Sequence, residues 1–260
     1  MRKTISTLVA ATALMLGSSL SFAGDWSKVR VGVEGAYPPF SWVEADGTLK
    51  GFDIDITMAL CKEIGAECTL VQSDWDGIIP SLLAKKYDAI IASMSITEER
   101  KKKVAFTSKY YNTPGKFARK RGSDIEITKE GLAGKTVGVQ RATTYDNFIS
   151  EEFGDAVEIK RYGTQDEAYL DAVSGRIDLL MADSVAMDDG FLSTDNGKDW
   201  EFVGPNYSDV KYFGEGAGIA VRKEDRDLAD KLSAAISTIR ANGVYEAINK
   251  KYFEFDVFGG

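Results

Sequence analysis

Short apolar runs alternate with longer amphipathic stretches from residue 29 onward. The runs have the length of buried strands, and the stretches between them carry apolar residues at helical spacing. A regular alternation of strand and helix is typical of a parallel sheet covered by helices. For the first part of the chain we therefore predict strands at residues 29–33, 68–71 and 89–92, and helices at residues 53–64 and 78–84.

Two details of this first part follow from its residues. Residues 34–40 contain two prolines and are predicted as a loop outside regular structure. The helix at 53–64 is expected to bury one apolar stripe, made of Ile54, Met58, Cys61 and Ile64.

The same pattern occurs a second time further along the chain. Residues 30–36 are echoed by residues 136–142, and residues 86–93 by residues 176–183. Because the repeated segments include the residues that follow each predicted strand as well as the strand itself, we expect two α/β lobes of similar design. The remaining predicted elements are strands at 157–161 and 216–221 and helices at 165–173 and 225–241.

Two segments are predicted to cross between the lobes. One lies at residues 107–115, and the other at residues 204–216, where Gly-Pro and Gly-Glu-Gly interrupt regular structure. Two crossings predict a hinge. The expected fold class is therefore α/β with two lobes, each a mainly parallel sheet flanked by helices, with residues 24–111 and 213–260 in lobe 1 and residues 112–212 in lobe 2.

Polar and aromatic side chains follow the carboxyl ends of the predicted strands, where ligands bind in open α/β sheets. If the lobes face each other, these side chains line one cleft. The alternative is that they are ordinary loop residues of two unrelated α/β domains, which the matching echoes disfavour. The residues are Glu34, Tyr37, Trp75, Ser93 and Ser95 in lobe 1 and Gln140, Thr143 and Asp183 in lobe 2.

Thr97 and the acidic residues after it predict a helix start directly behind the strand at 89–92. The unpaired N–H groups and the dipole of a helix start form an anion site. Arg100, one turn further, is suited to bind a carboxylate through two hydrogen bonds. The alternative is a solvated helix face with ion pairs four residues apart, Glu98 with Lys102 and Glu99 with Lys103. We expect that alternative for residues 101–103, whereas for Arg100 both remain open.

Residues 1–23 have the pattern of a secretory signal peptide, with Arg2 and Lys3, an apolar stretch, and small residues before a cleavage site after Ala23. The apolar stretch is interrupted and too short to span a membrane. Export to an oxidising compartment favours a structural disulfide between Cys61 and Cys68, the only cysteines, which would tie a helix end to the next strand. The Cys-x-x-Cys spacing of redox motifs is absent.

Charge and composition exclude several functions. The formal net charge is −8, and removal of the two basic residues of the signal peptide makes it more negative. Nucleic acids and anionic membranes are therefore not expected as partners. The sequence contains no histidine, which excludes Ser-His-Asp, Cys-His and histidine–metal chemistry.

Six motifs together resemble the periplasmic amino-acid-binding proteins of ABC importers, solute-binding protein family 3. The resemblance covers nearly the whole mature chain and is strongest for the lysine/arginine/ornithine and arginine/ornithine type. It implies the type II periplasmic-binding-protein fold, a periplasmic monomer that delivers its ligand to an inner-membrane ABC permease, and no cofactor. The motifs are Gly-Phe-Asp-Ile-Asp at 51–55, Asp-Gly-Ile-Ile-Pro-Ser-Leu at 76–82, the segment 88–100, Lys-Thr-Val-Gly-Val-Gln at 135–140, Lys-Tyr-Phe-Gly at 211–214 and Lys-Tyr-Phe at 251–253.

The resemblance implies how the ends of an amino acid are bound. Arg100, with the backbone near Ser95 and Thr143, would bind the α-carboxylate. Asp183 and Ser93 would bind the α-ammonium. A guanidinium fork suits a carboxylate, and a carboxylate suits an ammonium.

The side chain of the ligand would lie between Tyr37 and Trp75, with Glu34 at its distal cation. Aromatic walls suit an aliphatic stem that ends in a guanidinium, through area burial and cation–π attraction. Ala92 stands where the lysine/arginine/ornithine proteins have a second Ser, and Tyr145 where they have Gln, so the distal end of the pocket is expected to differ.

The leading hypothesis is thus a receptor for a basic amino acid, arginine or ornithine with lysine as a further candidate, without catalysis. One alternative is a receptor for an arginine-derived opine or a neutral polar amino acid. Another is a dehydratase on the same scaffold, which would have to use carboxylates such as Glu34 or Asp183.

Overall fold

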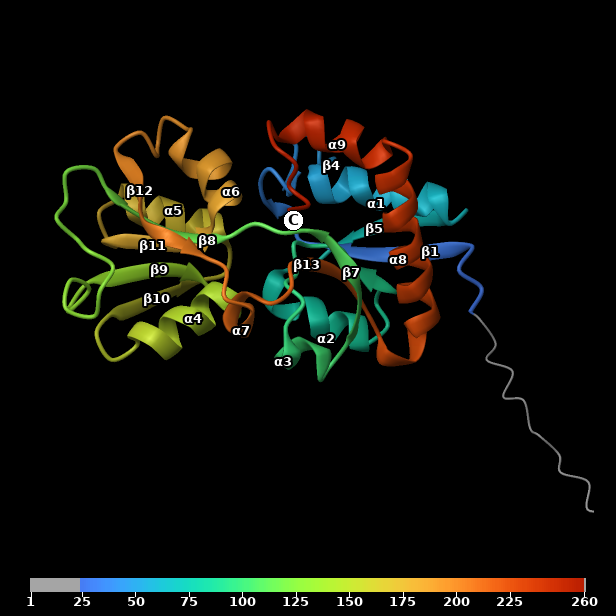
Figure 1. Cartoon of the computed structure of the whole chain (residues 1–260), viewed down its shortest axis with the longest axis horizontal. Helices are drawn as coiled ribbons and strands as arrows, with labels where there is room; N and C mark the ends of the chain where they lie inside the picture. The colour runs from blue at the N-terminus through green and yellow to red at the C-terminus, as the bar shows by residue number, and fades with distance from the viewer. Residues whose placement is uncertain (1–23, 260) are drawn as a thin grey trace, which may run out of the picture.

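The computed structural model describes residues 24–259, and the predicted signal peptide lies outside them. Figure 1 shows two lobes side by side, each a sheet with helices against it, joined by segments that cross between them. The predicted fold class is therefore confirmed.

The first lobe contains a five-stranded sheet in the order β5-β1-β6-β13-β7. β1 (Lys28–Val33) is parallel to β5 (Glu67–Gln72) and β6 (Ala89–Ile90) on either side of it. β13 (Ala217–Val221) is antiparallel to β6 and to β7 (Ala105–Tyr111). Four of these five strands therefore run in one direction.

The second lobe repeats this arrangement in the order β10-β9-β11-β8-β12. β9 (Thr136–Gln140) is parallel to β10 (Glu158–Tyr162) and β11 (Leu179–Asp183), and β8 (Gly115–Lys120) is antiparallel to β11 and to β12 (Trp200–Tyr207). In each sheet the antiparallel strand is the one that the chain enters from the other lobe. The echo in the sequence thus corresponds to a repeated topology.

Alternating side chains in the first sheet pack against different helices, because successive residues of a strand point to opposite faces. Ile219 and Val221 of β13 belong to a core with α1 (Phe52–Glu63), α8 (Arg226–Ala241) and α9 (Val244–Tyr252). Ala220 faces the other way, into a core with α2 (Ile78–Leu83). The second lobe is covered by α4 (Thr144–Phe153) and α5 (Gln165–Val173).

Several short elements complete the fold. They are α3 (Glu98–Lys101), α6 (Ser184–Met187), α7 (Val210–Phe213), η1 (Trp75–Gly77), η2 (Asp188–Leu192), η3 (Lys223–Asp225) and a small sheet of β2 (Ala36–Tyr37), β3 (Ser41–Val43) and β4 (Leu49–Lys50). The prediction of a loop at 34–40 was therefore wrong in part, since Ala36 and Tyr37 pair with Trp42 and Ser41. A two-residue strand is too short to show an alternating pattern.

Two further expectations need correction. Met58 is 49% exposed, because α1 buries Phe52, Ile56 and Leu60 rather than a stripe through Met58. The predicted pairs of Glu98 with Lys102 and Glu99 with Lys103 do not form among the described residues; Lys101 bonds to Glu98 and Glu215 instead. The reason is that α3 ends after one turn, so residues four apart no longer share a helix face.

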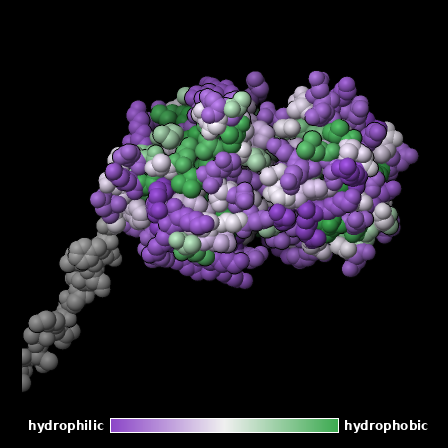
Figure 2. Space-filling view, turned by 180° about the vertical axis from the view of Figure 1, so that it is seen from behind, coloured by the Kyte–Doolittle hydropathy of each residue, from purple (hydrophilic) through white to green (hydrophobic). Residues whose placement is uncertain are grey.

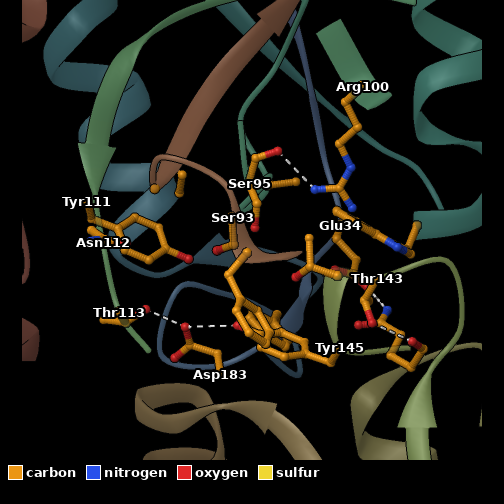
Figure 3. Close-up of a pocket in the computed structure, with 18 residues that line it drawn as sticks. Glu34, Ser93, Ser95, Arg100, Tyr111, Asn112, Thr113, Thr143, Tyr145 and Asp183 are labelled. Atoms are coloured by element: carbon orange, nitrogen blue, oxygen red, sulfur yellow. Dashed lines mark hydrogen bonds between the residues drawn. The ribbon is translucent and has the colours of Figure 1, made fainter. Parts of the chain in front are cut away.

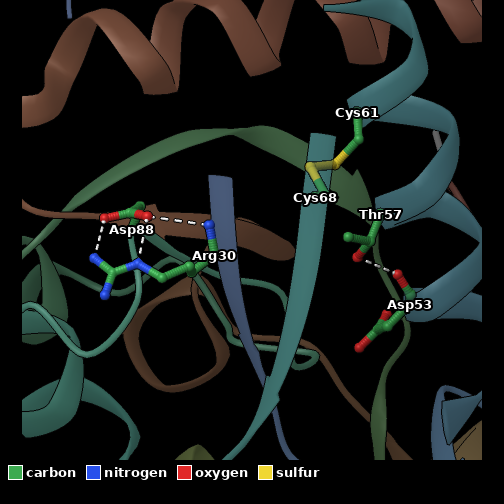
Figure 4. The surroundings of a disulfide bond; sticks show 6 residues. All are labelled: Arg30, Asp53, Thr57, Cys61, Cys68 and Asp88. Carbon is green, nitrogen blue, oxygen red and sulfur yellow. Dashed lines mark hydrogen bonds and ion pairs between the residues drawn. A yellow bond between two sulfur atoms is a disulfide. The ribbon is translucent and has the colours of Figure 1, made fainter. Parts of the chain in front are cut away.

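The predicted disulfide is present between Cys61 at the end of α1 and Cys68 in β5, with 6.0 Å between the two Cα atoms (Figure 4). The chain passes between the sheets at residues 112–114 and at residues 208–216. We propose these two segments as the hinge, with the lobe limits expected from the sequence.

Figure 2 shows the reverse face of the molecule as mostly hydrophilic, with separate apolar patches on both lobes. None of the helices in residues 24–259 has the length and apolar character that crossing a membrane requires.

Candidate ligand-binding site

A pocket between the lobes brings together all ten side chains predicted for the site (Figure 3). Seven come from lobe 1 and three from lobe 2. They lie together because the strands of each sheet end at its edge toward the other lobe. The ten are Glu34, Tyr37, Trp75, Ala92, Ser93, Ser95, Arg100, Gln140, Thr143 and Asp183.

Arg100 turns its guanidinium into this pocket. Nη1 donates to the carbonyl oxygen of Ser95 at 3.1 Å, and Nη2 donates across the cleft to that of Ala142 at 3.4 Å. The guanidinium carbon lies 5.2 Å from the centre of the Trp75 ring. Burial lowers the pKa of Arg100 to about 10, so the side chain is still cationic at neutral pH.

No carboxylate among residues 24–259 forms an ion pair with Arg100. Its positive charge in the pocket is therefore uncompensated within the described residues. A buried charge without a partner is costly, so this position favours an anionic group from a ligand.

The helix start predicted behind Ser95 contributes less than expected. α3 is a single turn, and the Thr97 hydroxyl accepts a hydrogen bond from the Arg100 N–H at 3.2 Å. A single turn has only a small dipole. The longer helix at the pocket is α4, which begins at Thr144 with Thr143 as its N-cap. Its first-turn N–H groups and dipole are on the lobe 2 side of the site.

Asp183, the last residue of β11, is a buried carboxylate that lines the pocket from lobe 2. Oδ1 accepts hydrogen bonds from the N–H groups of Val185 at 2.8 Å and Ala186 at 3.1 Å. Oδ2 accepts one from the Thr113 hydroxyl and one from the Tyr145 hydroxyl at 3.4 Å (Figure 3). Burial raises the pKa of Asp183. These contacts orient the carboxylate but bring no positive charge.

Glu34 follows β1 and is only 6% exposed. Its Oε1 accepts a hydrogen bond of 2.6 Å from Nε2 of Gln140 in the other lobe. Burial raises the pKa of Glu34 to about 8, with smaller contributions from the negative charges of Asp166, Asp53 and Asp76. Ionisation here is unfavourable unless a cation arrives, so the position favours a cationic group.

Tyr37 and Trp75 supply aromatic surface to the same pocket, and both are about nine-tenths buried. Tyr37 stacks on Phe40, with 6.0 Å between ring centres. Trp75 carries Arg100 over its ring. Tyr145, which the resemblance marked as a departure, lines the pocket and lies 5.7 Å from the ring of Phe213.

Ser93 holds an unusual backbone conformation beside the pocket. Its φ of +52° lies in the left-handed region, which is uncommon for a residue other than glycine. Its N–H donates to the Tyr110 hydroxyl at 3.1 Å, and its own hydroxyl donates to Oδ2 of Asp53 at 3.0 Å.

Two groups of residues near the site were not predicted from the sequence. Asp53 lies behind Ser93, and the available signal was an acid on the buried stripe of α1, three and seven residues before Ile56 and Leu60. The rest come mainly from the crossing segments and from α4, whose position depends on how the lobes meet. These are Tyr111, Asn112, Thr113, Thr144, Phe213, Gly216 and Ala217.

The chain is similar to known binding proteins over almost its full length. An L-arginine-binding protein of Pseudomonas aeruginosa is 53% identical over 253 residues, which cover 97% of each chain. A histidine-binding periplasmic protein of Escherichia coli is 44% identical over 257 residues, covering 97% of this chain and 99% of the relative.

A solved structure of a Salmonella typhimurium periplasmic binding protein with high arginine specificity matches with a TM-score of 0.80 at 32% identity, covering 87% of this chain and 99% of the other. The family model of the bacterial extracellular solute-binding proteins, family 3, matches residues 29–255. The family predicted from the motifs is therefore confirmed, and the chain belongs to family 3 of the bacterial extracellular solute-binding proteins.

Proposed function

We propose that this protein is a monomeric periplasmic receptor that binds a basic amino acid between its lobes and delivers it unchanged to an inner-membrane ABC permease. Arginine and ornithine are the expected ligands, with lysine as a further one. The observation that carries the proposal is the set of buried ionisable groups in the pocket that have no oppositely charged partner among the described residues, with a cation at Arg100 and carboxyl groups at Asp183 and Glu34.

This pattern is complementary to one class of small molecule. An α-amino acid carries a carboxylate and an ammonium on the same carbon atom, and Arg100 and Asp183 would bind these two groups. A basic side chain adds a second cation, which Glu34 would bind. The names of the relatives agree, since an arginine-binding and a histidine-binding protein are 53% and 44% identical to this chain.

The aromatic side chains favour a ligand with a long stem. Tyr37 and Trp75 would cover the aliphatic part of arginine or ornithine on two sides, which removes apolar area from water. A terminal guanidinium also gains cation–π attraction at an aromatic face. Ala92 and Tyr145 change the distal end, so a larger opine derived from arginine stays as an alternative ligand.

Catalysis is not part of the proposed function. The chain has no histidine, and both of its cysteines are in the disulfide. A dehydratase would have to use Glu34 or Asp183, whose raised pKa values follow from burial and whose positions in the pocket suit binding of the ligand's cationic groups.

The proposal is tested by thermal-shift screening of the twenty amino acids, ornithine and an opine, followed by mass analysis of the ligand recovered from the protein. We expect the largest shifts with arginine and ornithine, and recovery of unchanged ligand. A larger thermal shift with histidine or a neutral amino acid than with arginine and ornithine would contradict the proposed ligand specificity. Chemical conversion of the ligand would contradict the receptor function.

A further inference from the structure

Asp53 is a fully buried carboxylate that lies behind the pocket rather than in its lining. It is in the first turn of α1, where Thr57 donates a hydrogen bond to its backbone oxygen (Figure 4). Its two carboxylate oxygens accept from different hydroxyls. Oδ1 accepts from Tyr110 at 2.9 Å, and Oδ2 accepts from Ser93 at 3.0 Å.

This arrangement determines what Ser93 can offer to a ligand. A serine hydroxyl has one hydrogen and two lone pairs. When its hydrogen is given to Asp53, only lone pairs remain for the pocket, and these accept hydrogen bonds. The Ser93 backbone is also held in place, because its N–H donates to the same Tyr110 hydroxyl that bonds to Asp53.

We propose that Asp53 is a positioning residue that fixes the Ser93 hydroxyl as a hydrogen-bond acceptor for the ligand's α-ammonium, and so makes the site require an α-amino group. This inference rests on the proposed capture of an amino acid. A protonated Asp53 would instead donate to Ser93, and the Ser93 hydrogen would then point at an ammonium that also needs an acceptor.

The surroundings of Asp53 support this coupling. The titratable groups near it are Tyr110 and Tyr111 from β7, Tyr245 from α9, Glu34 after β1 and Asp183 from lobe 2, and none of these is cationic. Burial raises the pKa of Asp53 to about 7. A ligand ammonium at Ser93 would favour the ionised carboxylate, which is the form that keeps Ser93 an acceptor.

The test compares arginine with 5-guanidinopentanoate, which is arginine without its α-amino group, by calorimetry. In Asp53→Asn we expect the affinity for arginine to fall about tenfold or more, because a hydrogen bond to a charged group is impaired. The affinity for 5-guanidinopentanoate should change less than about twofold, since it does not use Ser93 as an acceptor. When Ser93→Ala is already present, adding Asp53→Asn should lower the affinity for arginine only slightly further.

The matched control is Asp55→Asn. Asp55 is on the same helix but bonds to Lys251 and Tyr252, away from the pocket. It should leave the affinities for both ligands unchanged. An equal loss of both ligands in Asp53→Asn, or full additivity with Ser93→Ala, would show that Asp53 is merely structural and would overturn the inference.

If Asp53→Asn does not fold, Tyr110→Phe addresses the same coupling. Loss of the Tyr110 donor makes the Asp53 anion less stable, so the affinity for arginine should fall and recover as pH rises, relative to 5-guanidinopentanoate. A loss that is the same for both ligands at every pH would contradict the inference. If the wild-type protein binds neither ligand, it is the proposed function that fails.

Discussion

At the scale of single residues, the site depends on side chains whose charge is buried without an opposite charge from the described residues. Arg100 is the clearest case. Truncation of one partner of a buried charge pair typically costs roughly 2–5 kcal/mol, so Arg100→Ala should weaken arginine binding about 30-fold or more. Calorimetry is the measurement, and Arg100→Lys is the control that keeps the charge but loses the fork. Near-normal affinity of Arg100→Ala would contradict the role of Arg100 in binding the ligand's carboxylate.

Glu34 predicts a pH dependence of binding. Its raised pKa of about 8 means that the pocket without ligand favours the neutral acid below that pH. A cationic ligand side chain binds the ionised form, so binding at lower pH must release a proton. Arginine affinity should therefore rise roughly tenfold or more from about pH 6 to pH 8.

This pH effect is measured by calorimetry in two buffers of different ionisation enthalpy, which gives the number of protons released. Glu34→Gln should remove most of both the proton release and the rise in affinity. Affinity that is constant over this range in the wild-type protein would contradict the assignment of Glu34.

At the scale of elements, the disulfide links the end of α1 to β5 across a separation of seven residues. The chain-entropy model gives a stabilisation of about 2 kcal/mol for a loop this short. The double variant Cys61→Ala, Cys68→Ala should lose about that much free energy of unfolding in urea, with little change in arginine affinity. Thiol titration of the denatured, unreduced protein should find no free thiol, and two reactive thiols would rule out the bond.

The long elements were predictable from the sequence because their patterns repeat over many residues. α5 matches its prediction at both ends, and β1, β13 and α8 each differ from theirs by one residue at one end. Short elements were not predictable, because two or four residues are too few to show a periodic pattern of apolar residues. β2 was missed for this reason, and α3 was expected to be longer.

The candidate site was predictable to the extent that it follows strand ends. Glu34, Gln140 and Asp183 lie at the carboxyl ends of β1, β9 and β11. Asp53, which lies behind these residues, was not predictable, because the hydrogen bond that Ser93 donates to it joins residues 40 positions apart. Likewise, Thr113 reaches Asp183 only because β8 pairs with β11 within lobe 2, which brings together residues 70 positions apart.

At the scale of the whole molecule, the lobes touch through polar contacts beside the pocket. Asp76 in lobe 1 forms an ion pair with Arg141 in lobe 2, next in sequence to Trp75 and Gln140. Both side chains are partly exposed, with 38% and 50% of their surface accessible, so the ion pair is expected to stabilise the contact between the lobes only modestly.

We expect Asp76→Asn to speed ligand release by a factor of about two to five, measured by stopped-flow displacement, because the pair exists only while the lobes are together. High salt should produce the same acceleration in the wild-type protein and little further change in the variant. Glu246→Gln, which removes an exposed ion pair within α9, is the control. Equal release rates in both variants would exclude a role of the Asp76–Arg141 pair in closure.

The central claim is that Glu34 makes the pocket select a ligand with a second positive charge, on its side chain, in addition to the α-ammonium. Citrulline is the neutral near-isostere of arginine, so the two ligands differ chiefly in that charge. A buried carboxylate without a cation is costly, and calorimetry of the wild-type protein should therefore show citrulline binding at least about tenfold more weakly than arginine. Glu34→Gln should close most of that gap. Citrulline binding as tightly as arginine to the wild-type protein would contradict the selection of a basic ligand.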